Sequence, residues 1–306
     1  MEHPGFIDVQ VNGYLGIDFS SPGLSTEDVH RVTEALARDG TAGYCATIIT
    51  SPPELYRVNL PVLARAMRED GSRGRLLGIH IEGPFISPVD GARGAHAAAH
   101  CRKPDPAEFD RMQEWADGNI VLLTMAPELD GGLAMIERVR KRGGTAVCLG
   151  HHLASRRVIK EAVLAGAAAS THLGNGCPNT IPRHDNVLFH QLAEPGLLAG
   201  LITDGHHLPE DFIRVACKCK GPEGVFIVSD AAPVAGLPPG VYDTLGNRVR
   251  LTETGRVESM DGPFFVGSGL NLPACVKHLR SLGIWSEDQI LRVARDNALR
   301  LIGLSV

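Results

Sequence analysis

Four short apolar runs of the chain each end in a side chain that could bind a metal ion or move a proton: Glu82, His151, His172 and Asp230. Two histidines and one carboxylate, with a fourth position left open, form a familiar catalytic zinc set. A further carboxylate beside such a metal can take a proton from its water and pass it to a leaving amine. The four residues therefore predict a hydrolytic metal centre with Asp230 as its acid–base group.

The spacing of the two histidines supports this prediction. His151 and His172 are separated by one amphipathic stretch, 155–165. Where parallel strands alternate with helices, consecutive strands end at the same rim, so both imidazoles would meet there. Two ordinary loop histidines are the alternative, but the carboxylate of Glu82 at an equivalent strand end favours the metal site.

The first predicted strand indicates how many metal ions to expect. Gln10 and Asn12 alternate onto one face, where many metallohydrolases carry a His-x-His pair. Amides are poor zinc ligands compared with imidazoles, so we expect one metal ion and not two. Zn²⁺ suits the predicted ligands best, and Fe²⁺, Co²⁺ or Mn²⁺ could also bind there.

Apolar, β-branched runs alternate with amphipathic stretches along the whole chain. We predict eight strands, at 5–12, 41–50, 75–82, 119–125, 145–150, 167–173, 198–203 and 224–229. Helices are predicted at Glu27–Arg38, Pro53–Arg68, Leu133–Arg142, Ser155–Ala165, near 270–282 and at Ser286–Ile302. This order predicts an α/β fold, a (β/α)₈ TIM barrel. A doubly wound sheet fits less well, because the polar residues end several different strands and do not gather at one crossover.

Two long irregular segments interrupt the alternation. Segment 174–197 is rich in Asn, Pro and His, and segment 231–267 begins with a Pro- and Gly-rich stretch and then resembles a β-hairpin. Long loops at the carboxyl end of a barrel usually shape a substrate pocket.

The bulk composition excludes several classes of partner. The chain has 306 residues, 43% of them hydrophobic, and a net charge of −5, which fits a single barrel domain over 1–306. Nothing in this charge balance predicts binding to a nucleic acid or an anionic membrane. No signal-like start and no membrane-spanning run is visible, and the seven cysteines are scattered, so a cytoplasmic location is expected.

Eight segments together resemble a known family. They are Pro4–Gly13, Gly78–Phe85, Gly94–His96, Leu149–His151, Thr171–Asn175, Ile202–His207, Val228–Ala231 and Gly267–Leu270. In this order, over nearly the whole chain, they resemble the N-acetylglucosamine-6-phosphate deacetylases of the amidohydrolase superfamily. The resemblance implies removal of an acetyl group from an N-acetylated amino sugar, giving acetate and the free amino sugar.

The resemblance also implies roles for individual residues. Glu82, His151 and His172 would hold the metal, and Asp230 would act first as general base and then as general acid. His96 would help the metal polarise the acetyl carbonyl. Substrate contacts would come from His207, Asn175, Gly94 and Ala95.

The chain departs from the family pattern at its ends. Family members usually carry flanking strands that build a small β-sandwich, whereas here the predicted barrel fills the chain, so we expect a barrel-only member. The amino end of such a barrel would then need another cover, such as a partner subunit in a homodimer.

A second departure concerns the phosphate. The family carries an arginine immediately before Glu-Pro-Gly that binds phosphate across a dimer interface, but here Ala193 precedes Glu194–Gly196. Alanine cannot replace a bidentate arginine. Either Arg183, with His184 or His190, supplies an anchor from the rebuilt 174–197 loop, or the substrate has no 6-phosphate; the loss of the arginine favours the second.

Two other functions stay open at this stage. One is hydrolysis of a different N-acyl or cyclic amide, although enzymes that use two metals for this typically need the His-x-His pair. The other is a non-catalytic sugar-binding barrel, against which the retained ligand set and Asp230 argue.

Overall fold

Eight parallel strands form the barrel in the computed structural model, which describes residues 5–306. Their order is β1 (Phe6–Val11), β4 (Thr41–Ile49), β5 (Leu76–Glu82), β6 (Ile120–Met125), β7 (Ala146–Leu149), β8 (Ala167–Ser170), β9 (Leu198–Ile202) and β10 (Val225–Val228). The ring is completed by a bridge between Val11 and Ala231, where the N–H of Asn12 donates to the carbonyl of Ala231 at 2.9 Å. The predicted (β/α)₈ fold and all eight predicted strands are confirmed.

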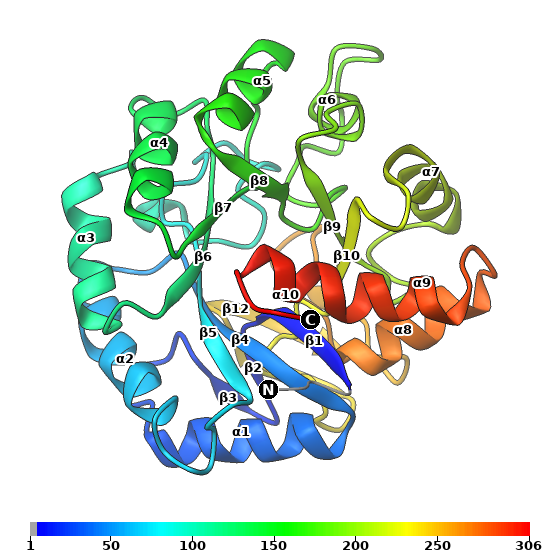
Figure 1. Ribbon diagram of the computed structural model, residues 1–306. Helices are drawn as coiled ribbons and strands as arrows, with labels where there is room; N and C mark the ends of the chain where they lie inside the picture. The colour runs from blue at the N-terminus through cyan, green and yellow to red at the C-terminus, as the bar shows by residue number, and fades with distance from the viewer. Residues whose placement is uncertain (1–4) are drawn as a thin grey trace.

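Helices surround the strands (Figure 1). They are α1 (Thr26–Arg38), α2 (Pro53–Ala66), α3 (Pro106–Trp115), α4 (Gly132–Arg142), α5 (Arg156–Ala165), α6 (Val187–Leu192), α7 (Glu210–Lys220), α8 (Leu272–Ser281), α9 (Glu287–Leu291) and α10 (Asn297–Leu301). Ser155 caps α5, its side chain accepting from the N–H of Val158. Among residues 5–306, no helix is long and apolar enough to span a membrane.

The last predicted helix differs from the structure in one respect. A π-helical turn, Arg292–Asp296, separates α9 from α10, so Ser286–Ile302 is not one uniform α-helix. Widening of the helix there changes the hydrogen-bond spacing without disturbing the apolar pattern, which is why the sequence did not reveal it.

Part of the amino end of the barrel is covered by the chain itself. Helix α10 crosses the near end of the barrel in Figure 1, and Ala298, Leu299, Leu301 and Ile302 share one hydrophobic cluster with barrel-strand residues. Residues from the amino ends of six strands pack against that cluster: Ala42, Leu77, Val121, Ala146, Ala168 and Leu198. The chain therefore supplies part of the cover for this end, and these six side chains are only partly buried, so a partner subunit in a homodimer stays a prediction.

A small antiparallel sheet lies beyond β10. Its strands are β11 (Gly240–Thr244), β12 (Asn247–Leu251) and β13 (Val257–Ser259), so the predicted hairpin has a third strand. The sheet has its own hydrophobic cluster, which includes the buried Val249 and Val266. The side chain of Asn247 donates to the carbonyl of Ala95 at 3.2 Å, which ties the sheet to the loop after β5.

Candidate active site

Three side chains from different strands converge at the carboxyl end of the barrel. Oε1 of Glu82 lies 3.0 Å from Nε2 of His172 and 3.3 Å from Nε2 of His151, and the two Nε2 atoms are 3.0 Å apart. All three residues are buried. Donor atoms that share one zinc ion at about 2.0–2.2 Å lie about 3.3 Å apart around a tetrahedron, so these separations suit a metal site.

The strand ends turn sharply to direct these side chains. His151, His172 and Asp230 have φ values of 53°, 29° and 52°, in the left-handed region that residues other than glycine seldom adopt. Each such residue costs about 1–3 kcal/mol, which the surrounding structure must offset. Strain at three rim positions, after β7, β8 and β10, is typical of a functional site, and apolar spacing in the sequence cannot reveal it.

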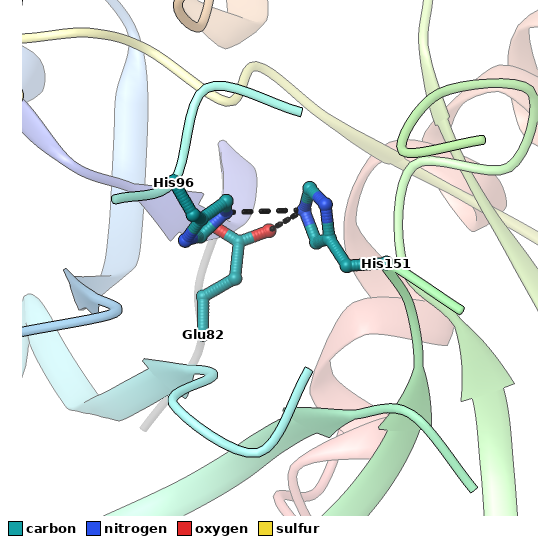
Figure 2. A group of neighbouring side chains, drawn as sticks. All are labelled: Glu82, His96 and His151. Carbon is teal, nitrogen blue, oxygen red and sulfur yellow. Dashed lines mark hydrogen bonds and ion pairs between the residues drawn. The ribbon is translucent and has the colours of Figure 1, made fainter. Parts of the chain in front are cut away.

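A third histidine joins the cluster from the loop after β5. Nε2 of His96 lies 3.2 Å from Nε2 of His151, and one donor atom each from Glu82, His96 and His151 fall within 4.8 Å of one another (Figure 2). Nε2 of His172 lies closer still to both Glu82 and His151, at 3.0 Å from each, so four side chains surround the candidate metal site. The structure thus brings together every predicted ligand.

The hydrogen bonds of the histidines test whether a cation fits here. Nδ1 of His151 lies 2.9 Å from the carbonyl of Ala92, which can only accept, so Nδ1 carries the proton. Thr50 donates to the carbonyl of Glu82, so Thr50 accepts from Nδ1 of His96 at 2.9 Å. Burial, and then the charge of His151, lower the pKa of His96 to about 3. Unprotonated Nε2 atoms therefore face each other beside a carboxylate, an arrangement that a divalent metal stabilises.

Asp230 stands next to this cluster and is held by the amides of the first strand. Nδ2 of Asn12 donates to Oδ1 of Asp230 at 2.8 Å, and Nε2 of Gln10 donates to the same oxygen at 3.1 Å and to Oε1 of Glu82 at 2.8 Å. Burial, and then the negative charge of Glu82, raise the pKa of Asp230 to about 6. The side-chain amides of Gln10 and Asn12 thus lie beside Asp230, where a second metal ion would need ligands such as imidazoles.

A pocket of about 880 Å³ opens over the cluster, and the residues predicted to contact the substrate, Gly94, Ala95, Asn175 and His207, are among those that line it. Gly94 has a φ of +59°, and a Cβ there would lie 3.3 Å from the His151 ring. A glycine thus lets the backbone approach the metal site closely.

His207 is held in the pocket wall by a residue that the sequence analysis did not single out. Its Nδ1 lies 2.8 Å from Oδ2 of Asp204, which also accepts from Ser268 at 2.8 Å. Although burial opposes it, the hydrogen bonds and charge of His207 hold the pKa of Asp204 well below its usual range. Asp204 lies three positions before His207 in the sequence. A carboxylate so close to a predicted substrate-binding histidine could have indicated that the two side chains pair.

The predicted phosphate anchors lie elsewhere in the described part of the chain. Arg183 is exposed and lines a second, more apolar hollow beside Phe189 and Phe212. His184 is exposed, and His190 is buried and pairs with Asp185 at 2.8 Å. None of these three residues lines the 880 Å³ pocket.

Curated proteins similar to this chain share one description. The chain is 34% identical to the mouse N-acetylglucosamine-6-phosphate deacetylase and 35% identical to the human one, each over 98% of this chain and 74% of the relative. It is 32% identical to the Bacillus subtilis protein of the same description, over 98% of this chain and 75% of that protein.

The chain belongs to the N-acetylglucosamine-6-phosphate deacetylase family. No family model matches it. The deacetylase from Mycobacterium smegmatis has a similar solved structure, with a TM-score of 0.89 and 28% identity over 98% of this chain and 78% of that one. A variant from the same organism, solved in complex with N-acetyl-D-glucosamine-6-phosphate, also gives a TM-score of 0.89, at 27% identity over 98% of this chain and 77% of that one.

Proposed function

We propose that this protein hydrolyses the acetamide of N-acetylglucosamine 6-phosphate, releasing acetate and the amino sugar. The observation that carries the proposal is the convergence of Glu82, His151 and His172 beside the buried Asp230, in a member of the deacetylase family. The relative solved with this sugar phosphate supports the choice of substrate.

One divalent metal, with Zn²⁺ the best match to two imidazoles and a carboxylate, would be held by Glu82, His151 and His172. When bound, it would lower the pKa of a coordinated water from about 15.7 toward about 7 and polarise the acetyl carbonyl. The lone pairs on Nε2 of His96 and His151 face each other at 3.2 Å, and a bound cation would relieve their repulsion.

Asp230 is proposed to move the protons of the reaction. Its carboxylate takes a proton from the attacking water and then gives it to the departing nitrogen, which leaves as an amine. A pKa raised to about 6 keeps Asp230 largely ionised at pH 7 and still basic enough to accept the proton. Gln10 and Asn12 orient the carboxylate through the shared oxygen Oδ1.

The other pocket residues are proposed to place the substrate. With metal and substrate bound, a change to the tautomer with the proton on Nε2 would let His96 donate to the carbonyl oxygen as negative charge develops there, and Nδ1 would then accept from the Thr50 hydroxyl. Gly94, Ala95, Asn175 and His207 would surround the sugar ring, since all four line the pocket.

An acetate-release assay on protein of known metal content tests the proposal. N-acetylglucosamine 6-phosphate, N-acetylglucosamine and an N-acetyl amino acid would be compared as substrates. We expect the sugar phosphate to give the highest kcat/KM. Metal-loaded protein that releases acetate from none of them would refute the function, and a preference for the amino acid would point to the alternative N-acyl substrate class.

A further inference from the structure

We propose that Arg256, immediately before β13 of the small antiparallel sheet, binds the anionic 6-substituent of the substrate within the same chain. The inference rests on the proposed function. It supplies a cation for the subsite at which Ala193 takes the place of the family's arginine, and Arg256 comes from a part of the chain that the sequence comparison did not connect with phosphate.

The position of Arg256 places it in the wall of the pocket that the candidate metal ligands also line. Arg256 lines the 880 Å³ pocket together with His207, His172 and Asp230. Its guanidinium carbon lies 4.9 Å from the centre of the Phe265 ring, whose centre lies 4.9 Å from that of the His207 ring. The three side chains form one continuous wall, so a sugar that contacts His207 brings its far end toward Arg256.

Arg256 is also the pocket arginine whose hydrogen-bonding groups are available. Arg93, the other arginine in the lining, donates from Nη1 to the carbonyl of His96 at 2.6 Å and from Nη2 to Asp90. Arg256 instead pairs through Nε with Glu258 at 3.0 Å, and its side chain is 47% exposed. Among residues 5–306, no hydrogen bond engages its two Nη groups.

The chemistry of the guanidinium matches a phosphate. Two neighbouring N–H groups can donate in parallel to two phosphate oxygens, and the flat group is oriented in advance by the Phe265 ring. Glu258 is the carboxylate that competes for the same charge, so it should weaken the anion site without abolishing it. This predicts opposite effects for substitutions of Arg256 and Glu258.

Turnover of two substrates provides the first test. Arg256→Ala should lower kcat/KM for N-acetylglucosamine 6-phosphate about 10- to 100-fold, mostly through KM, which is the loss expected for charged hydrogen bonds. For N-acetylglucosamine the same substitution should change kcat/KM less than about threefold. Arg248→Ala, an exposed arginine of β12 that does not line the pocket, is the matched control and should change neither value. Equal losses on both substrates, or no loss, would overturn the proposal.

Binding of the amino sugar product provides a test that does not depend on turnover. Glucosamine 6-phosphate and glucosamine would be titrated into wild type and variants by calorimetry. Arg256→Ala should weaken the phosphorylated ligand about 10-fold or more, and Glu258→Gln should tighten it a few-fold. Loss of binding in Arg183→Ala but not in Arg256→Ala would assign the anchor to the 174–197 loop and overturn the inference.

The two measurements separate this inference from the proposed function. Wild type that binds glucosamine 6-phosphate through Arg256 but releases no acetate would refute the deacetylase activity and leave the anion site standing. Wild type that deacetylates the sugar phosphate with no effect of Arg256→Ala would leave the activity standing and refute the anion site.

Discussion

The barrel rim and the small β11–β13 sheet face the same pocket but are built in different ways. The rim holds buried side chains on separate strands of a closed barrel, and contacts across the barrel, such as Glu82 with His172, fix their positions. The sheet consists of three short strands over a separate hydrophobic cluster, and it presents the half-exposed Arg256. The difference suits the two proposed roles: the barrel rim would hold the groups that cleave the amide bond, and the small sheet would add one contact to the substrate-binding residues of the barrel loops.

Removal of the metal should have the largest effect. Treatment with a chelator should abolish nearly all acetate release, because the water would lose its activation, and Zn²⁺ should restore it. The melting temperature should also fall, since the unprotonated nitrogens of His96 and His151 would face each other without a cation. Full activity in protein with no detectable metal would refute the proposal that the barrel rim holds a catalytic metal ion.

Asp230→Asn should have the next largest effect. We expect kcat to fall about 10²- to 10⁴-fold, the usual contribution of general acid–base catalysis. The metal content should stay unchanged, because Asp230 is not in the proposed ligand set. Metal lost in proportion to activity would instead make Asp230 a ligand.

The pH profile should report the environment of Asp230. The carboxylate form is the active one, so kcat/KM should fall about tenfold per pH unit below its pKa. The raised pKa of about 6 is an upper limit for the pH at which this acidic limb of the profile begins, because a bound cation favours the carboxylate form of Asp230.

Asn12→Ala should move this limb to higher pH. It removes a hydrogen bond that favours the charged form of Asp230. A limb that stays in place in Asn12→Ala and persists in Asp230→Asn would belong to another group.

Matched core substitutions should have the smallest effect and separate the two regions most sharply. Val249→Ala in the small sheet and Val147→Ala in β7 each delete the same atoms from a buried site, at a cost of about 1–3 kcal/mol in the free energy of unfolding. Val249→Ala should raise KM a few-fold with kcat and metal content retained. Val147→Ala should lower metal affinity, because β7 carries His151; identical kinetic effects would show that the regions are not independent.

Strands were easier to predict than helices, for a physical reason. Barrel strands are buried on both faces and read as short apolar runs, so all eight appeared in the sequence. Helices α3 and α7 were not predicted, although α7 places Ile213, Ala216 and Cys217 on one buried face. Helix α6 has only six residues, too few for a periodic pattern to be distinguished from a loop.

The sequence by itself determined the barrel and the meeting of Glu82, His151, His172 and Asp230, because the carboxyl ends of all parallel strands in a barrel lie at one rim. Only the tertiary structure decided which residues face the metal cluster from outside the barrel. Arg256 and Phe265 reach the pocket because a separate sheet folds back over the rim, and α10 packs against the amino end of the barrel. Such contacts join segments distant along the chain, and neither periodicity nor spacing encodes the path between them.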